Sequence, residues 1–232
     1  MSSITPNITS HLSIAWKEKH ADLFVTEHWN NFINQFNRYL KEKPTEFRLP
    51  YFNKEVTPPI NQIMTYFKSA YHTIIQEEKC PQNAWAKVLQ NAPFEYLLIV
   101  LGQRLTPASI TDERAIPPLR QNLVESCAET YNGEICVGTR AWEKHVGRSE
   151  KTSPQPPSKG EFWGEIKGTP AEREQYVKNL VLQLIDNKTW WNVFFHYKHE
   201  LVYEIRIESG HGIRWNKGGT SIIGFLEPFI NE

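Results

Sequence analysis

The sequence predicts an α+β fold, in which the N-terminal two-thirds are mostly helical and pack with a small antiparallel sheet at the C-terminus. Apolar residues recur at helical spacing from Thr26 onward. After Asn187 they alternate with a period of two, which is typical of half-buried strands. The 232 residues include 8 Trp, 9 Tyr and 12 Phe, enough ring surface to build a core without disulfides. We expect residues 1–232 to form a single domain.

Prolines mark the limits of the helices expected in the first half of the chain. Pro58 and Pro59 precede the clearest apolar stripe, at a position where a missing N–H costs least, and Pro81 follows it. Residues 1–15 are polar and show no period, which predicts a loose tail. The helices are expected over residues 26–40, 60–75, 83–91 and 94–105.

Two further helices are expected in the middle of the chain. Pro117 and Pro118 open the first, which should run to about Ala128. The second should cover residues 139–147, with Gly147 as its stop.

A low-complexity tract precedes the last helix. Residues 148–160 are rich in Ser, Pro, Lys and Gly, and we expect them to form a flexible surface loop. Thr169 and Glu172 then have the spacing of a capping box, with Pro170 at the first helical position, which predicts a helix to about Ile185.

The C-terminal part has the alternation of an antiparallel sheet. Glu204, Arg206 and Glu208 alternate with apolar residues, so one strand face should be polar. A Lys217-Gly-Gly turn should close the last hairpin. The strands are expected over residues 190–197, 201–208, 213–216 and 221–226.

Charge and cysteine content limit the class of protein. Lys and Arg total 26, as do Asp and Glu, whereas a general nucleic-acid binder or a membrane-surface binder usually has a basic excess. We therefore expect neither general nucleic-acid binding nor membrane association. The three cysteines form no CxxC pair and the N-terminus lacks the pattern of a signal peptide, so we expect a soluble protein with free thiols in the cytoplasm or nucleus.

The first candidate site is a row of cations on the helix expected over residues 139–147. Arg140, Lys144 and Arg148 are one helical turn apart and share a face. Such a row suits a phosphate or carboxylate, and His145 beside it could move a proton. An ordinary solvated basic face, with Glu143 nearby, would show the same pattern.

The second candidate is the segment from Gly210 to Trp215. Its two glycines flank His211 and allow a sharp turn that approaches a ligand closely. Arg214 and Trp215 could clamp and stack on a planar or phosphorylated group. A simple hairpin turn uses the same residue types.

Two other charged residues also allow two interpretations each. Arg206 could face a cleft, or it could belong to a charge ladder with Glu204 and Glu208. Glu227 could act as a general acid or base, or it could be an exposed carboxylate at a strand end.

We expect neither a metal site nor a cofactor. His196 and His199 are three residues apart, but a strand would splay them. The sequence has no phosphate loop, nucleophile elbow, HExxH motif or dinucleotide fingerprint.

Several short motifs lie in residues 137–228. They are Thr139-Arg-Ala, Lys144-His145, Arg148-Ser149, Phe162-Trp-Gly164, Trp191-Asn192, Glu204-x-Arg206, Gly210-x-Gly212-x-Arg214-Trp215 and Gly224-Phe-Leu-Glu-Pro228. Together they resemble a tract in a family of uncharacterised proteins, and the resemblance carries no activity. It implies that five side chains converge on one cleft: His145, Arg148, Trp163, Arg214 and Glu227.

We therefore hypothesise an enzyme or ligand-binding protein for an anionic, phosphate-bearing substrate, such as a nucleotide or an RNA end. His145 would be the acid or base and Glu227 its partner. The expected substrate-binding residues are Arg140, Lys144, Arg148, Trp163, Arg206, His211, Arg214 and Trp215. The alternative is a non-catalytic protein-interaction module, in which an aromatic-rich groove of the helical half binds a protein partner.

Overall fold

The computed structural model describes residues 2–42, 54–152 and 160–229, without the side chains of residues 148–152, 160, 161 and 199. The chain divides into two compact units. Unit 1 consists of residues 1–47 and 55–116, and unit 2 consists of residues 48–54 and 117–232. The expectation of a single domain over the whole chain stays a prediction.

Unit 1 is helical in its described part. The predicted helices are present, but α5 ends at Leu101 because Gly102 takes a positive φ of 112° and donates its N–H to the carbonyls of Leu98 and Ile99. The helices are η1 (Pro6–His11), α1 (Ile14–Lys19), η2 (Ala21–Phe24), α2 (Thr26–Lys41), α3 (Ile60–Glu78), α4 (Pro81–Asn91), α5 (Phe94–Leu101) and η3 (Glu113–Ala115).

The first residues of unit 1 differ from the predicted loose tail. Ile4, Ile8 and Leu12 are buried, and both backbone polar groups of Ile4 bond to the side chain of Asn37 at 2.9 and 2.8 Å. These apolar residues are too few to give a visible period. Their burial and the two bonds to Asn37 anchor the segment.

The aromatic residues of unit 1 form its core. Rings of α2, α3 and α4 contact one another in a continuous series, and their members are almost completely buried. The series includes Trp29, Phe32, Phe36, Phe67, Trp85 and Tyr71. These rings therefore stabilise the unit and do not line the groove that the interaction hypothesis requires.

Unit 2 contains a four-stranded antiparallel sheet and confirms the α+β prediction. The strands are β1 (Lys188–His196), β2 (His199–Ile207), β3 (Gly212–Asn216) and β4 (Ile222–Leu226), paired in the order β1-β2-β3-β4. Between β2 and β3, Gly210 takes a φ of +87°, as a tight turn requires. Gly212 has no room for a Cβ, which would lie 2.2 Å from the carbonyl oxygen of Ile205 on β2. The second glycine therefore allows close strand packing and does not serve approach to a ligand.

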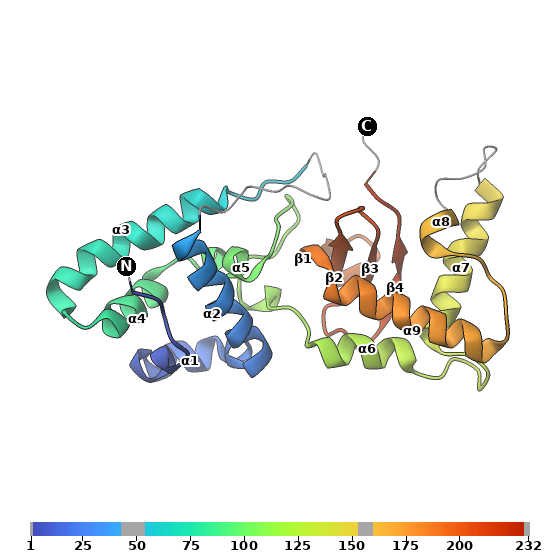
Figure 1. Ribbon diagram of the computed structural model, residues 1–232, viewed down its shortest axis with the longest axis horizontal. Helices are drawn as coiled ribbons and strands as arrows, with labels where there is room; N and C mark the ends of the chain where they lie inside the picture. Colours follow the sequence, from blue (N-terminus) through green and yellow to red (C-terminus); the bar gives the residue numbers. More distant parts are fainter. Residues whose placement is uncertain (1, 43–53, 153–159, 230–232) are drawn as a thin grey trace. The chain divides into compact units, whose positions relative to one another are not determined.

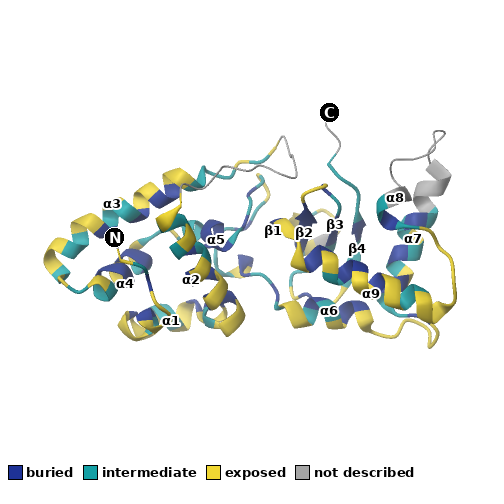
Figure 2. Cartoon of the chain, viewed as in Figure 1, coloured by how far each residue is buried: buried dark blue, intermediate teal, exposed yellow. Residues whose placement is uncertain are grey.

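Helices of unit 2 pack against this sheet. They are α6 (Arg120–Ala128), α7 (Val137–Thr152), α8 (Gly160–Trp163) and α9 (Pro170–Asp186). Helix α7 packs against β4, and α9 packs against β2 and β3 (Figure 1). Figure 2 shows buried and exposed residues alternating along α6 and α9, as expected for helices with one face in the core.

The ends of two helices test the local predictions. The capping box of α9 is confirmed, since the Thr169 hydroxyl accepts from the Glu172 N–H and the Glu172 carboxylate accepts from the Thr169 N–H. In contrast, Gly147 does not stop α7, which continues to Thr152. The predicted loop over residues 148–160 is thus helical at its start, and residues 153–159 lie outside the described part of the chain. None of the described helices is both long and apolar enough to cross a membrane.

Candidate functional site

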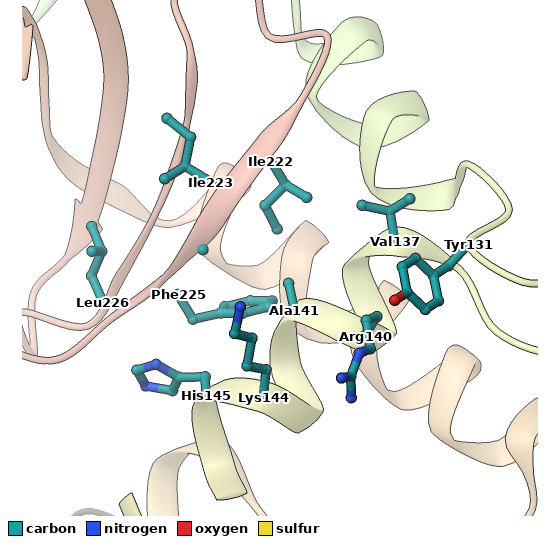
Figure 3. A pocket seen from close by; sticks show the side chains of 11 residues that line it. Tyr131, Val137, Arg140, Ala141, Lys144, His145, Ile222, Ile223, Phe225 and Leu226 are labelled. Atoms are coloured by element: carbon teal, nitrogen blue, oxygen red, sulfur yellow. The ribbon is translucent and has the colours of Figure 1, made fainter. Parts of the chain in front are cut away.

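A pocket of about 370 Å³ lies between α7 and β4 in unit 2 (Figure 3). Helix α7 contributes residues three or four positions apart, so they lie on its one face. The other walls come from β4 and from Tyr131, in the loop before α7. The lining residues are Tyr131, Val137, Arg140, Ala141, Lys144, His145, Ile222, Ile223, Gly224, Phe225 and Leu226.

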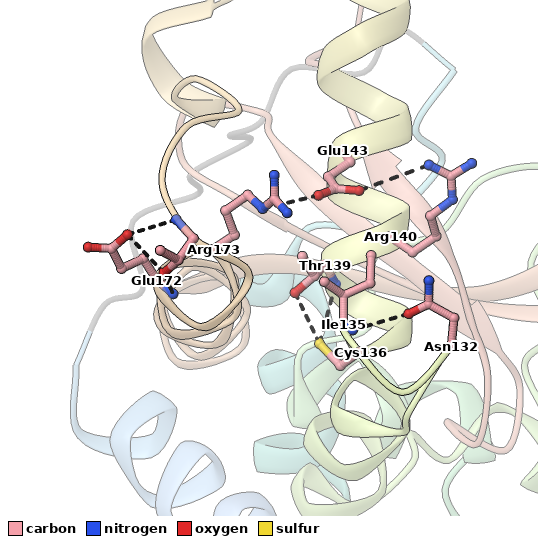
Figure 4. A network of polar contacts seen from close by, with 9 residues as sticks. Asn132, Ile135, Cys136, Thr139, Arg140, Glu143, Glu172 and Arg173 are labelled. Atoms are coloured by element: carbon pink, nitrogen blue, oxygen red, sulfur yellow. Dashed lines mark hydrogen bonds and ion pairs between the residues drawn. The ribbon is translucent and has the colours of Figure 1, made fainter.

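The start of α7 is fixed by close packing and by polar contacts (Figure 4). A Cβ on Gly138 would lie 2.8 Å from the carbonyl oxygen of Cys127, so the glycine lets α7 approach α6 closely. The Cys136 sulfur accepts from the Thr139 N–H at 3.4 Å, which satisfies a free N–H group of the first helical turn.

An ion-pair network then fixes α7 against α9. Glu143 contacts the Arg173 guanidinium at 3.3 Å, and it reaches Arg140 at only 4.0 Å (Figure 4). Arg140 therefore remains 48% exposed at its side chain.

The polar wall of the pocket carries positive charge. Lys144 is exposed, and no residue of the described chain forms an ion pair with it. Among the acidic residues that the structure describes, Arg140 contacts Glu143 alone, at 4.0 Å. Because ammonium and guanidinium groups favour anions, the pocket can bind a phosphate or carboxylate.

His145 connects this pocket to a second cluster. Its Nε2 lies 3.3 Å from Oε1 of Glu227, while Nε2 of His211 lies 3.8 Å from Oε2 of the same carboxylate. Both carboxylate oxygens are buried and accept no hydrogen bond within the described residues. A buried carboxylate without donors is costly, so a protonated imidazole beside it is stabilising. Burial lowers the pKa of His211, and the charge of Glu227 partly opposes this effect.

Aromatic rings hold the two imidazoles in place. Phe162 stacks on His211 with ring centroids 3.9 Å apart, and the edge of Trp163 contacts both histidines at 5.0 and 5.3 Å. Trp142 on α7 donates its indole N–H to the Trp163 carbonyl at 2.8 Å. Trp163 is 1% exposed, so it supports the histidines and offers no free face to a ligand.

The other predicted anion-binding arginines are used inside unit 2. Glu204 accepts from Arg206 at 2.6 Å through Oε1 and from Arg214 through Oε2 at 2.8 and 2.5 Å. Arg206 also donates to the carbonyls of Gly210 and Glu227, both at 2.7 Å. It is 4% exposed, and burial lowers its pKa against the opposing effect of Glu204. Arg206 therefore stabilises the turn and the end of β4, and we leave it out of the candidate site.

Trp215, another predicted position, does not line the pocket. Trp215 has 0% exposure, so its ring is part of the core and is not available for stacking on a ligand. The side chain of Arg148 lies outside the described part of the chain.

The structure thus brings together some of the predicted residues and adds others. Arg140, Lys144 and His145 share the pocket, and His145, Glu227 and His211 share the second cluster. Sequence reasoning missed Tyr131 and the apolar residues of β4. The β4 residues have a signal in the alternation that predicts their strand, but Tyr131 stands in a segment without any period.

A second pocket, of about 350 Å³, lies between α6 and α9 and is lined by both Cys127 and Cys136. Burial raises the pKa of Cys127 to about 12, so this thiol is unreactive at neutral pH. Within the described residues, no group of three or more His, Cys, Asp or Glu side chains is arranged to hold a metal ion.

Residues 124–227 match the family model of the CdiA C-terminal tRNase toxin domain. The matched stretch begins in α6 and contains the pocket, His145, His211 and Glu227. It covers less than half of the chain and is a similarity to that domain. No curated protein and no solved structure matches the chain.

Proposed function

We propose that this chain is an RNA-cleaving enzyme, with tRNA as its substrate class, whose active site is the α7–β4 pocket together with Glu227. One observation carries the proposal. His145 lines a cationic pocket and at the same time contacts a buried carboxylate, within the stretch that is similar to a tRNase domain. The equal numbers of basic and acidic residues argue against general nucleic-acid binding, but local cations in a pocket are sufficient to bind individual phosphate groups.

Each group has a role in this proposal. Lys144 binds the oxygens of the phosphate that is cleaved and stabilises the charge that develops on them. Glu227 orients the His145 ring and stabilises its protonated form, as a carboxylate does for an imidazole base. His211, which stacks on Phe162, contacts Glu227 from the other side.

The reaction that fits these residues is a transesterification. His145 accepts the proton of the ribose 2′-hydroxyl, whose oxygen attacks the adjacent phosphorus. The bond from phosphorus to the 5′-oxygen breaks, and this oxygen takes a proton from water. The resulting hydroxide takes the proton from His145, which restores the neutral imidazole. The products are a 2′,3′-cyclic phosphate and a 5′-hydroxyl end.

The test is cleavage of purified tRNA, followed on denaturing gels with end-group analysis of the products. The wild type should cleave tRNA, and His145→Ala should lower the rate by about 10²- to 10⁴-fold. Substitution of a 2′-deoxynucleotide at the cleaved position should block the reaction. His72→Ala is the matched control, because His72 is an exposed histidine on α3 of unit 1.

Thermal unfolding of each variant would show whether a loss of activity reflects loss of fold. The proposal fails if the wild type cleaves no RNA, or if His145→Ala retains full activity while folded.

A further inference from the structure

Tyr131 and His145 stand at opposite ends of the α7–β4 pocket. Figure 3 shows the polar residues in the order Tyr131, Arg140, Lys144, His145 along it. His145 is the proposed acid–base residue at one end. Tyr131 and Arg140, at the other end, have no role in the bond-breaking step.

The Tyr131 ring is held in an exposed position by a fixed backbone. Its N–H donates to the Ile135 carbonyl at 2.9 Å, and the Asn132 carboxamide accepts from the N–H groups of Glu134 and Ile135, both at 3.2 Å. A bridge between Thr130 and Cys136 closes the same loop. The backbone is therefore ordered by its own hydrogen bonds, while 54% of Tyr131 is exposed at the pocket.

Arg140 adds a cation beside this ring. Its guanidinium carbon lies 5.8 Å from the centre of the Tyr131 ring, and among the described residues its one acidic contact is Glu143, at 4.0 Å. Arg140 and Lys144 are four residues apart on α7, or about 6 Å along the helix axis. Two cations placed in this way can bind two successive phosphate groups of one strand.

We propose that Tyr131 and Arg140 form a second subsite, in which the Tyr131 ring stacks on an unpaired base and Arg140 binds the phosphate next to the one cleaved. This inference rests on the proposed function, because it assigns RNA to the same pocket. A paired base presents no free face to a side chain, whereas an unpaired base can stack on an aromatic ring. The subsite therefore selects single-stranded segments of RNA.

The experiment compares one oligoribonucleotide alone and annealed to its complement. Stacking of a base on an aromatic ring corresponds to about 5- to 150-fold in affinity. Tyr131→Ala should raise KM for the single strand by a factor in this range with a smaller change in kcat. Tyr131→Phe, which keeps the ring, should stay within about 2-fold of the wild type. Annealing should lower cleavage by the wild type to near that of Tyr131→Ala.

Tyr197→Ala provides the matched control. Tyr197 is 85% exposed in the β1–β2 hairpin and does not line the pocket, so its removal should leave KM unchanged. An equal loss in Tyr131→Phe and Tyr131→Ala would assign the effect to the hydroxyl and overturn the stacking subsite. Unchanged KM in Tyr131→Ala would overturn it as well.

A binding measurement separates this inference from the proposed function. A 2′-O-methyl oligoribonucleotide cannot undergo the transesterification, and fluorescence anisotropy gives its dissociation constant for each variant. Weaker binding by Tyr131→Ala supports the subsite even if no RNA is cleaved. Cleavage by the wild type with equal binding by Tyr131→Ala retains the proposed function and rejects the subsite.

Discussion

Two clusters in unit 2 each combine two basic side chains with a carboxylate, yet they differ in how the charges are paired. In the first, Glu204 receives Arg206 and Arg214 on its two oxygens, and both it and Arg206 are buried. In the other, which lies at the α7–β4 pocket, Glu143 approaches Arg140 only to 4.0 Å, and Lys144 has no ion-pair partner in the described residues. Residue type alone therefore does not identify an anion site. A cation that is already paired inside the protein stabilises the fold, and a cation that is left open to a pocket can bind a ligand.

The largest expected effect is on stability, at the buried cluster. Arg206→Ala would leave Glu204 with one cation and the carbonyls of Gly210 and Glu227 without their donor. We expect the free energy of unfolding to fall by about 3–5 kcal/mol, as for a broken buried ion pair. Urea unfolding measures this loss.

Arg120→Ala is the control for that experiment. Arg120 pairs with Asp186 at 2.9 Å, but the side chains are 46% and 51% exposed. Such a surface pair contributes at most about 1 kcal/mol. A loss in Arg206→Ala no larger than in Arg120→Ala would remove the structural role that distinguishes the first cluster.

The next effect is on activity, at the pocket. Lys144→Ala removes an ammonium group that forms no ion pair with any described residue and that the proposed reaction uses to stabilise a phosphate oxygen. We expect kcat/KM on tRNA to fall by about 10²-fold, as when one such donor is removed from an active site. The free energy of unfolding should change by no more than about 0.5 kcal/mol.

Lys178→Ala is the matched variant, because Lys178 is an exposed lysine of α9 that does not line this pocket. It should keep full activity. Equal losses in the two lysine variants would indicate a diffuse charge effect and not a phosphate contact in the pocket.

The sequence predicts the elements of the fold better than it predicts their ends or their partners. Periodicity and prolines locate the helices because side-chain direction follows directly from local geometry. Gly147 shows the limit of such signals. A glycine ends a helix when it takes a positive φ, and Gly147 lies inside α7 without one.

The candidate site is predictable only where its residues lie on one element. Arg140, Lys144 and His145 share a pocket wall because helical spacing places them there. Alternation in β2 shows that Glu204 and Arg206 share a face, but it does not show that the face is buried. Burial depends on what packs over the strand, and local spacing does not contain that information.

The pH dependence of stability should show a smaller effect, at the cluster of His145, Glu227 and His211. Burial lowers the pKa of His211 below its usual value near 6.5, with Glu227 opposing and Arg206 and His145 adding to the decrease. The unfolded chain then binds more protons below about pH 6.5, so the free energy of unfolding should decrease as the pH falls through this range.

His211→Gln cannot titrate and should show a shallower decrease than the wild type when unfolding is measured from pH 7.5 to 5. The comparison with the wild type is needed because burial also lowers the pKa of His20 in unit 1, which gives the same sign. Superimposable profiles would mean that His211 has the same proton affinity in the folded and unfolded states.

The smallest expected effect is on the salt dependence of RNA binding. It distinguishes most directly between the cations of the α7–β4 pocket and the arginines paired with Glu204. Each phosphate neutralised by a cation contributes about 0.7 to the slope of log Kd against log salt concentration for a single strand. With a 2′-O-methyl oligoribonucleotide as ligand, Lys144→Ala should lower that slope by about 0.7. Arg214→Ala should leave it unchanged, because the Arg214 guanidinium is already bound to Glu204. Titrations between 50 and 200 mM salt, by fluorescence anisotropy at a temperature where both variants are folded, resolve the difference. If Arg214→Ala lowered the slope as much as Lys144→Ala does, the paired arginine would also contact phosphate, and internal pairing would no longer distinguish a structural cation from a binding one.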